Sequence, residues 1–280
     1  MAVIQETFKL NNGLEIPKVG FGTWQIPKGE VAYEATLTAL KLGYRHIDTA
    51  RGYDNEVSVG QAIRDSGIPR EAIYLTTKLP AQIKTYEGAL ESFEKSMSEF
   101  GDGIDYVDLY LIHAPWDWAK QGQSDHKGNL EAWRAMSELQ AAGRIKSIGI
   151  SNFNVEDTKN ILENAEVKPV VNQIRWFVGN TQDEITAFCA EHDILIEAYS
   201  PLATGALLED PALKNIADKY GVSIPQICLR YCIEKGVLPL PKSTHANYIE
   251  SNAAIDFEMD ADDVRYLDSL KYNDHSLSER

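Results

Sequence analysis

Short apolar segments alternate with amphipathic segments along most of the chain. The short segments suit β-strands, while the amphipathic ones carry apolar residues at helical spacing, as Trp133, Met136 and Leu139 do. The pattern predicts eight core strands, at residues 19–24, 44–49, 73–79, 106–113, 145–151, 170–174, 194–200 and 237–241. Helical sequence follows each strand, at residues 30–42, 56–65, 85–100, 129–143, 155–164, 183–191, 210–220 with 225–235, and from Asn247.

This alternation predicts a (β/α)8 barrel, the TIM barrel, formed by a single domain over residues 1–280. Strands that are apolar throughout, such as the one opening at Ile194, belong in a parallel sheet covered on both faces. Eight strand–helix repeats close best into a barrel with its chemistry at the carboxyl ends of the strands; a doubly wound open sheet is the alternative. Asn12-Gly13 predicts an N-terminal β-hairpin that caps the barrel, and short extra helices are expected near the C-terminus.

The overall charge narrows the range of partners. Lys and Arg total 27 against 42 Asp and Glu, a formal charge of −15, which argues against nucleic acid and against a polybasic membrane contact. An anionic ligand therefore needs a local positive site.

The three cysteines, Cys189, Cys228 and Cys232, lack metal-ligand spacing, so we expect buried, reduced thiols. Without a signal-peptide pattern, a long apolar run or a sustained heptad repeat, we expect a cytoplasmic monomer.

Three successive predicted strands end in a titratable residue, namely Asp48, Lys78 and His113. Tyr53 follows the first of them after a turn that Gly52 permits. A phenol is a useful acid only if its pKa of about 10 is lowered, and a nearby ammonium does this by favouring the phenolate. Each residue alone is better explained as a solvated charge or a structural histidine. Together, at one rim, they predict an acid–base site.

The later strand ends carry amides, hydroxyls and an aromatic ring. Ser151 and Asn152 end the fifth strand, Gln173 lies near the end of the sixth, and Tyr199 lies at the end of the seventh. Such groups can hold a carboxamide and stack on a flat ring, as a nicotinamide requires, although each alone is ordinary as a cap, surface or core residue. Residues 242–244 end the eighth strand, where barrels recurrently bind phosphate.

Taken in order, these motifs resemble those of the aldo-keto reductases, specifically the small bacterial members similar to 2,5-diketo-D-gluconate reductase. The matching segments are GFGTW from Gly20, DTARGYDNE from Asp48, TTKL from Thr76, LIH from Leu111, GISN from Gly149, NQI from Asn172, AYSPL from Ala198 and PKS from Pro241. The resemblance covers nearly the whole chain. It implies reduction of aldehydes, ketones or diketo compounds to alcohols by hydride transfer, with NADPH as cofactor, NADH as the alternative and no metal.

The resemblance also implies roles for individual residues. Tyr53 is the expected general acid, Lys78 lowers its pKa, Asp48 pairs with Lys78, and His113 orients the substrate carbonyl. The positions that match cofactor contacts are Gly22, Thr23, Ser151, Asn152, Gln173, Tyr199, Ser200, Leu202, Lys242, Ser243, Thr244 and Asn252.

The substrate wall departs from the family pattern. Ala114 and Pro80 stand where the family often has Trp. We expect Trp24 and Trp116, helped by Trp118, to form the aromatic wall for the carbonyl substrate, whose size does not carry over from the family.

The nucleotide end departs as well, because Tyr248 stands where an Arg often contacts the 2′-phosphate of NADPH. Loss of that bidentate partner is expected to loosen the selectivity for NADPH.

Two other functions stay open. A nucleotide-bound regulatory or scaffold barrel with little turnover is one, although the complete catalytic set argues against it. A metal- or phosphate-using barrel hydrolase or isomerase is the other, and it lacks paired acid ligands.

Overall fold

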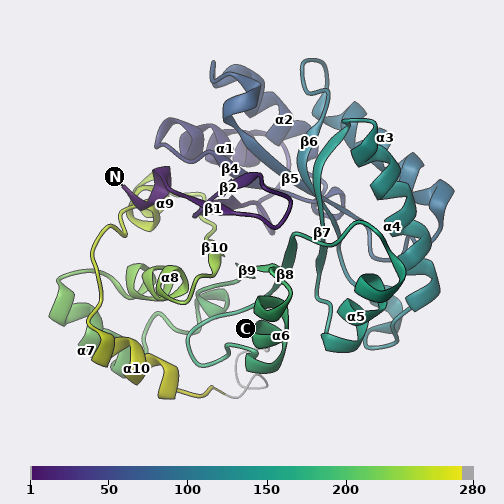
Figure 1. Cartoon of the computed structure of the whole chain (residues 1–280). Coiled ribbons are helices and arrows are strands. Elements are labelled where there is room, and N and C mark those ends of the chain that lie inside the picture. Colours follow the sequence, from purple (N-terminus) through teal and green to yellow (C-terminus); the bar gives the residue numbers. More distant parts are fainter. Residues whose placement is uncertain (1, 273–280) are drawn as a thin grey trace.

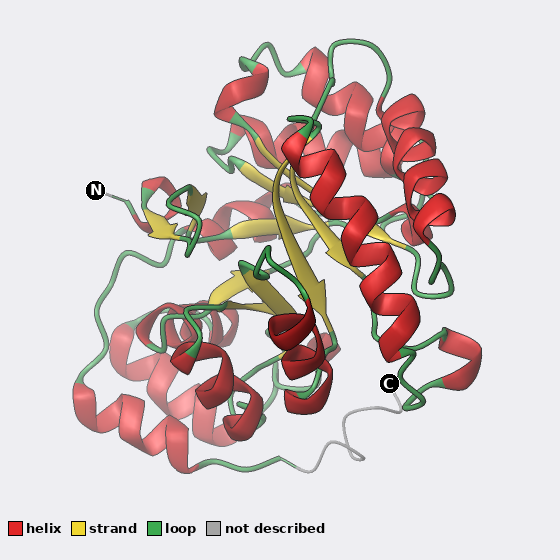
Figure 2. Cartoon of the chain, turned by 45° about the vertical axis from the view of Figure 1, so that its right-hand side comes forward, coloured by secondary structure: helices red, strands yellow, loops and turns green. Residues whose placement is uncertain are grey.

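Eight parallel strands form the centre of the molecule, as the computed structural model describes it over residues 2–272, and helices surround them (Figures 1 and 2). The strands are β3 (Gly20–Gly22), β4 (His46–Asp48), β5 (Tyr74–Leu79), β6 (Val107–Ile112), β7 (Ile145–Ser151), β8 (Val171–Arg175), β9 (Leu195–Tyr199) and β10 (Leu238–Leu240). Their order in the sheet follows the chain. Gly22 N donates to Pro241 O at 2.9 Å, which joins the two edges into a nearly closed barrel. The predicted (β/α)8 barrel is confirmed, and the open-sheet alternative is wrong.

The helices lie on the outside of the barrel. Those before β10 connect successive strands, as expected for parallel strands, and the last two follow β10. They are α1 (Glu30–Lys41), α2 (Glu56–Asp65), α3 (Tyr86–Phe100), α4 (His126–Ala141), α5 (Val155–Asn164), α6 (Asp183–Glu191), α7 (Pro211–Tyr220), α8 (Ile224–Glu234), α9 (Ala246–Ala253) and α10 (Ala261–Ser269). Helix α4 begins before the predicted residue 129 because Asp125 caps it by accepting from Gly128 N. The last two helices are the short extra ones expected near the C-terminus.

The N-terminal hairpin closes one end of the barrel. Strands β1 (Thr7–Lys9) and β2 (Glu15–Pro17) pair antiparallel, and Ile16 packs with Leu109 and Leu238 inside the barrel. Asn12 Nδ2 donates to Ser147 Oγ at 2.9 Å and ties the hairpin to the barrel wall. With this end covered, the carboxyl ends of the strands are the end at which a ligand can enter.

The three cysteines are buried and free, as expected. They lie in α6 and α8, which belong to the same apolar cluster against β9. Within residues 2–272, no helix is long and apolar enough to cross a membrane.

Helices α2 and α3 approach each other closely at Gly60. A Cβ at Gly60 would lie 2.3 Å from Phe100 O and 2.7 Å from Phe100 Cα, so a larger residue requires the backbone to move. Glycine at this buried helical position is therefore explained by packing, despite its lower helix propensity.

Replacing Gly60 by alanine tests this contact. We expect Gly60→Ala to lower the free energy of unfolding by about 1–3 kcal/mol, because overpacking outweighs the gain in helix propensity. Gln61→Ala, at an exposed position of the same helix, is the control and should change stability by less than about 0.5 kcal/mol. Chemical denaturation measures both. A Gly60→Ala protein as stable as the parent would show that the helices have room to separate.

Candidate active site

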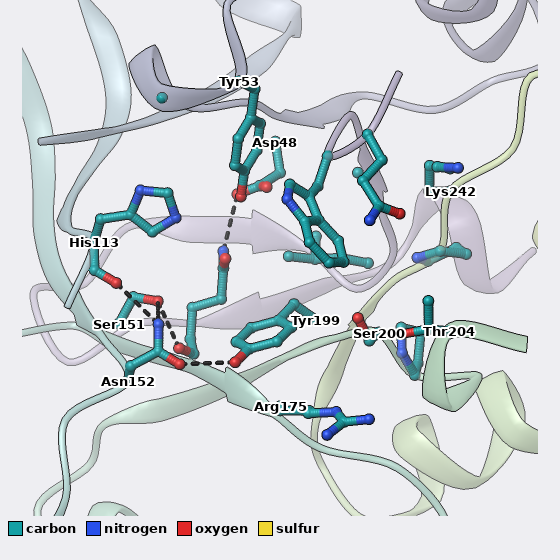
Figure 3. Close-up of a pocket in the computed structure, with 18 of the residues that line it drawn as sticks. Asp48, Tyr53, His113, Ser151, Asn152, Arg175, Tyr199, Ser200, Thr204 and Lys242 are labelled. Atoms are coloured by element: carbon teal, nitrogen blue, oxygen red, sulfur yellow. Dashed lines mark hydrogen bonds between the residues drawn. The ribbon is translucent and has the colours of Figure 1, made fainter. Parts of the chain in front are cut away.

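A pocket of about 1220 Å³ opens at the carboxyl ends of the strands (Figure 3). Thirteen of the residues predicted to form the site line it: Gly22, Trp24, Asp48, Tyr53, His113, Trp118, Ser151, Asn152, Gln173, Tyr199, Ser200, Leu202 and Lys242. Segments far apart in sequence thus meet at one rim because their strands are parallel neighbours.

A fully buried lysine lies beneath this rim. Lys78, in β5, is 0% exposed, and its ammonium donates to Asp48 Oδ1 at 2.7 Å and Oδ2 at 2.9 Å. It also donates to Thr49 O at 2.9 Å and contacts Tyr53 Oη at 3.2 Å. A buried charge needs a counter-charge and hydrogen bonds, and this ammonium has both. The arrangement places a cation in contact with the phenol at the pocket surface.

The pKa of Tyr53 is set by opposing effects. Burial raises it above the usual value, and the Asp48 carboxylate adds to the rise, while the Lys78 ammonium lowers it. The net direction is upward, so the expectation that Lys78 brings this pKa down towards neutrality is not met in the free protein. Burial also works to lower the pKa of Lys78, but Asp48 and Tyr53 outweigh it and raise that pKa. Tyr53 is therefore a protonated phenol and Lys78 an ammonium at neutral pH.

His113 follows β6 and lies beside Tyr53. The two rings are 5.6 Å apart and nearly perpendicular, and His113 N donates to Leu79 O at 3.2 Å. Burial, together with the smaller effect of the Lys78 ammonium, lowers the pKa of His113 to about 3. The imidazole is consequently neutral at physiological pH, and it can donate one N–H to a polar atom in the pocket.

The predicted carboxamide-binding groups form a connected set (Figure 3). Asn152 Nδ2 donates to His113 O at 2.9 Å and to Ser151 Oγ at 3.1 Å, and Asn152 Oδ1 accepts from Tyr199 Oη at 2.8 Å. Ser151 Oγ donates to Gln173 O at 2.8 Å. These bonds hold the ring of Tyr199 along one wall of the pocket, where its face can receive a flat ligand.

Gln173 is tied to a carboxyl group that the sequence reasoning missed. Its Nε2 donates to Asp48 Oδ2 at 2.9 Å and to Glu197 Oε2 at 2.8 Å. Burial raises the pKa of Glu197 to about 8, and Asp48 pushes it the same way, against Gln173 and Lys78. Glu197 could have been noticed as a charged residue in an otherwise apolar strand, two positions before Tyr199, so that both side chains leave β9 on the same face.

Several predicted residues do not line the pocket. Thr23 is buried behind it, and its Oγ1 donates to Asp48 O at 3.0 Å. Of the two tryptophans expected beside Trp24 in the substrate wall, Trp116 is absent from the lining, whereas Trp118 lines the pocket with its ring 5.5 Å from that of His113. The chain turns between the two tryptophans, which the sequence pattern did not reveal. The remaining predicted cofactor residues outside the lining are Ser243, Thr244 and Asn252.

Two arginines were also missed. Arg51 and Arg175 line the pocket together with Lys242, and three acids, Asp48, Asp54 and Glu99, line it as well. Arg51 donates to Glu99 Oε1 at 3.1 Å. Arg175 lies two positions after Gln173, and this spacing, which puts both side chains on the same face of β8, could have identified Arg175 from the sequence.

Within residues 2–272, no group of three or more His, Cys, Asp or Glu side chains could hold a metal ion.

A protonated tyrosine against a buried lysine, over a long pocket with amides and cations, is the arrangement of a barrel oxidoreductase. The chain belongs to the aldo/keto reductase family, whose model matches residues 18–271. The predicted family is confirmed.

Known relatives cover almost the whole chain. Glyoxal reductase of Bacillus subtilis (strain 168) is 40% identical over 268 residues, covering 95% of this chain and 93% of its own. An aldo/keto reductase structure from Brucella melitensis has a TM-score of 0.89 at 45% identity and covers 95% of this chain and 99% of that one. A Bombyx mori aldo-keto reductase in complex with NADP has a TM-score of 0.86 at 35% identity, covering 94% and 92%.

The raised pKa of Glu197 predicts a pH-dependent stability. Between its ordinary value of 4.5 and about 8, the folded protein holds a proton that the unfolded chain releases. Stability from this group is therefore greatest at low pH and is lost as pH rises through this range. From about pH 5 to about pH 8.5, we expect the parent to lose roughly 2–4 kcal/mol more unfolding free energy than Glu197→Gln, measured by urea denaturation. Parallel losses in both proteins would contradict the assignment.

Proposed function

We propose that this protein reduces small aldehydes, ketones or dicarbonyl compounds to alcohols with NADPH, and that Tyr53 is the general acid. The observation that carries the proposal is the contact of Tyr53 Oη with Lys78 Nζ at 3.2 Å, beside His113, in the wall of the large pocket. Membership of the aldo/keto reductase family supports the reaction class, and the glyoxal reductase relative supports a small dicarbonyl as one substrate.

The pocket residues fit a nicotinamide nucleotide. Gln173 Oε1 accepts no hydrogen bond from the described residues, although Gln173 lines the pocket, so an acceptor for a carboxamide N–H is available. The Tyr199 ring can stack against a nicotinamide, and Ser200 and Leu202 begin the loop that would follow the pyrophosphate. Lys242 is exposed at the far end and would bind a phosphate there. The Bombyx mori relative holds NADP, which supports NADPH as the cofactor of this chain.

The protein groups then divide the work of the reaction. A reduced nicotinamide supplies a hydride for the carbonyl carbon when it is bound. Tyr53 donates its phenolic proton to the carbonyl oxygen, and the Lys78 ammonium stabilises the phenolate that remains. Asp48 keeps Lys78 charged and in place, since it accepts two of the hydrogen bonds of the ammonium. Neutral His113 donates an N–H to the same carbonyl oxygen and so orients the substrate.

Trp24 and Trp118 are the aromatic residues that we propose for the substrate wall. They are 45% and 49% exposed, and both line the pocket. Exposed aromatic rings at the mouth of a pocket offer apolar contact area to a substrate at low entropic cost. A bound carbonyl compound would cover part of this surface.

The cellular setting is also a proposal. We infer that the protein works as a monomer in the cytoplasm. Three buried free thiols suit a reducing compartment, and the strong negative charge disfavours self-association.

Removal of the Tyr53 hydroxyl tests the chemistry. We expect Tyr53→Phe to lower kcat with glyoxal or a nitrobenzaldehyde by roughly 10²–10⁴, because the proton donor is lost, while NADPH binding stays close to that of the parent. Tyr266→Phe, at an exposed position of α10, is the matched control and should keep full activity. Oxidation of NADPH followed at 340 nm, and tryptophan fluorescence for binding, measure the two properties. A parent that binds NADPH without turning over any carbonyl compound would favour the regulatory or scaffold alternative.

Neutralising Lys242 tests the nucleotide end. A charge-assisted bond to the 2′-phosphate contributes about 1.5–3 kcal/mol, so Lys242→Met should weaken NADPH binding about tenfold or more. NADH lacks this phosphate, and its Kd should change less than about threefold. Lys127→Met, at an exposed position of α4 outside the pocket lining, controls for the lost charge. Equal losses for both nucleotides would place the 2′-phosphate away from Lys242.

A further inference from the structure

The amide of Gln173 is bound on one side by two acids. Its Nε2 donates to Asp48 Oδ2 at 2.9 Å and to Glu197 Oε2 at 2.8 Å. All three side chains are buried, with exposures of 2% for Gln173, 3% for Asp48 and 0% for Glu197. Both N–H bonds of the amide are therefore used inside the barrel, and its oxygen is the atom left for the pocket.

The opposite orientation of the amide is disfavoured. Rotating it by half a turn would put its oxygen within about 3 Å of Asp48 Oδ2, which is an acceptor, and of Glu197 Oε2, which is an acceptor unless the acid proton lies on that oxygen. Asp48 alone supplies only part of this restraint, because Lys78 donates to both of its carboxylate oxygens. Glu197 supplies the rest.

Among the described residues, the carboxyl group of Glu197 makes no hydrogen bond other than the one to Gln173, and Oε1 has no partner. The imidazole of His46 is 3.9 Å away, and its Nε2 is already bonded to Thr76 Oγ1 at 2.9 Å. A fully buried acid held by a single hydrogen bond destabilises a fold, so its presence is better explained by what it does to Gln173.

We propose that Glu197 is a positioning residue: through Gln173 it keeps an amide oxygen facing the pocket, and this oxygen selects a ring substituent that donates an N–H. The substituent is a carboxamide, as in nicotinamide, so the inference rests on the proposed nucleotide function and deepens it. The proton of a neutral Glu197 can lie on Oε1, so Oε2 accepts from Gln173 in either protonation state.

The test compares two nucleotides that differ only in that substituent. NADP⁺ carries a carboxamide, whereas its 3-acetylpyridine analogue carries a methyl ketone, which accepts hydrogen bonds but donates none. Their Kd values are measured for the full-length protein by quenching of tryptophan fluorescence, since Trp24 lines the pocket. Glu197→Met removes the acceptor, and Glu197→Gln offers Gln173 either an oxygen or a nitrogen.

We expect the parent to bind NADP⁺ about three- to tenfold tighter than the analogue, the effect of one neutral hydrogen bond. In Glu197→Met the two Kd values should differ by less than about twofold, because NADP⁺ binds more weakly while the Kd of the analogue changes little. Glu197→Gln should at least halve the preference. Glu56→Gln changes another buried acid, which accepts from Thr77 Oγ1 at 2.5 Å and does not line the pocket, and it should keep the parental ratio.

The outcomes distinguish an error in the role of Glu197 from an error in the proposed function. An unchanged ratio in either folded Glu197 variant, or an equal weakening of both nucleotides, would overturn the role of Glu197. Failure of the parent to bind either nucleotide would instead overturn the proposed function. If Glu197→Met does not fold, the isosteric Glu197→Gln decides the matter alone.

Discussion

The ion pair of Lys78 with Asp48 is the interaction on which the rest of the site depends. An ammonium with no solvent exposure is tolerated because a carboxylate accepts from it twice and Thr49 O accepts once more. The same pair places positive charge against Tyr53, and it adds to the effect of burial in keeping the imidazole of His113 neutral. Burial keeps the Tyr53 phenol protonated, and the Lys78 ammonium beside it favours the phenolate that proton donation would leave.

The barrel makes this concentration of polar groups possible. Parallel strands deliver the ends of β4, β5, β6, β8 and β9 to one rim, while the N-terminal hairpin and apolar side chains fill the other end. The polar interior continues below the rim through Gln173 to Glu197, and the raised pKa of Glu197 shows what that burial costs. The site is thus held by a network of side chains on rigid strands, with loops contributing the substrate wall.

The charges around the pocket differ from the charge of the whole chain. The chain has a formal charge of −15, whereas three cations, Arg51, Arg175 and Lys242, and three acids, Asp48, Asp54 and Glu99, line the cavity. Because charges more than about 10 Å apart are largely screened at about 0.1 M salt, a ligand in the cavity interacts mainly with these neighbouring groups. Local arrangement, and not the total charge, governs what the site can bind.

The sequence by itself determined the order of strands and helices, the barrel and the strand ends that carry Asp48, Lys78, His113 and Tyr199, because side-chain periodicity and the end of an apolar run are local properties. Only the tertiary structure decided that Trp118 and not Trp116 lines the pocket, that Glu197 holds Gln173, and that burial outweighs Lys78 in setting the pKa of Tyr53. These outcomes depend on loop direction and on desolvation by neighbours distant in the chain, and neither is encoded in a residue's own sequence surroundings.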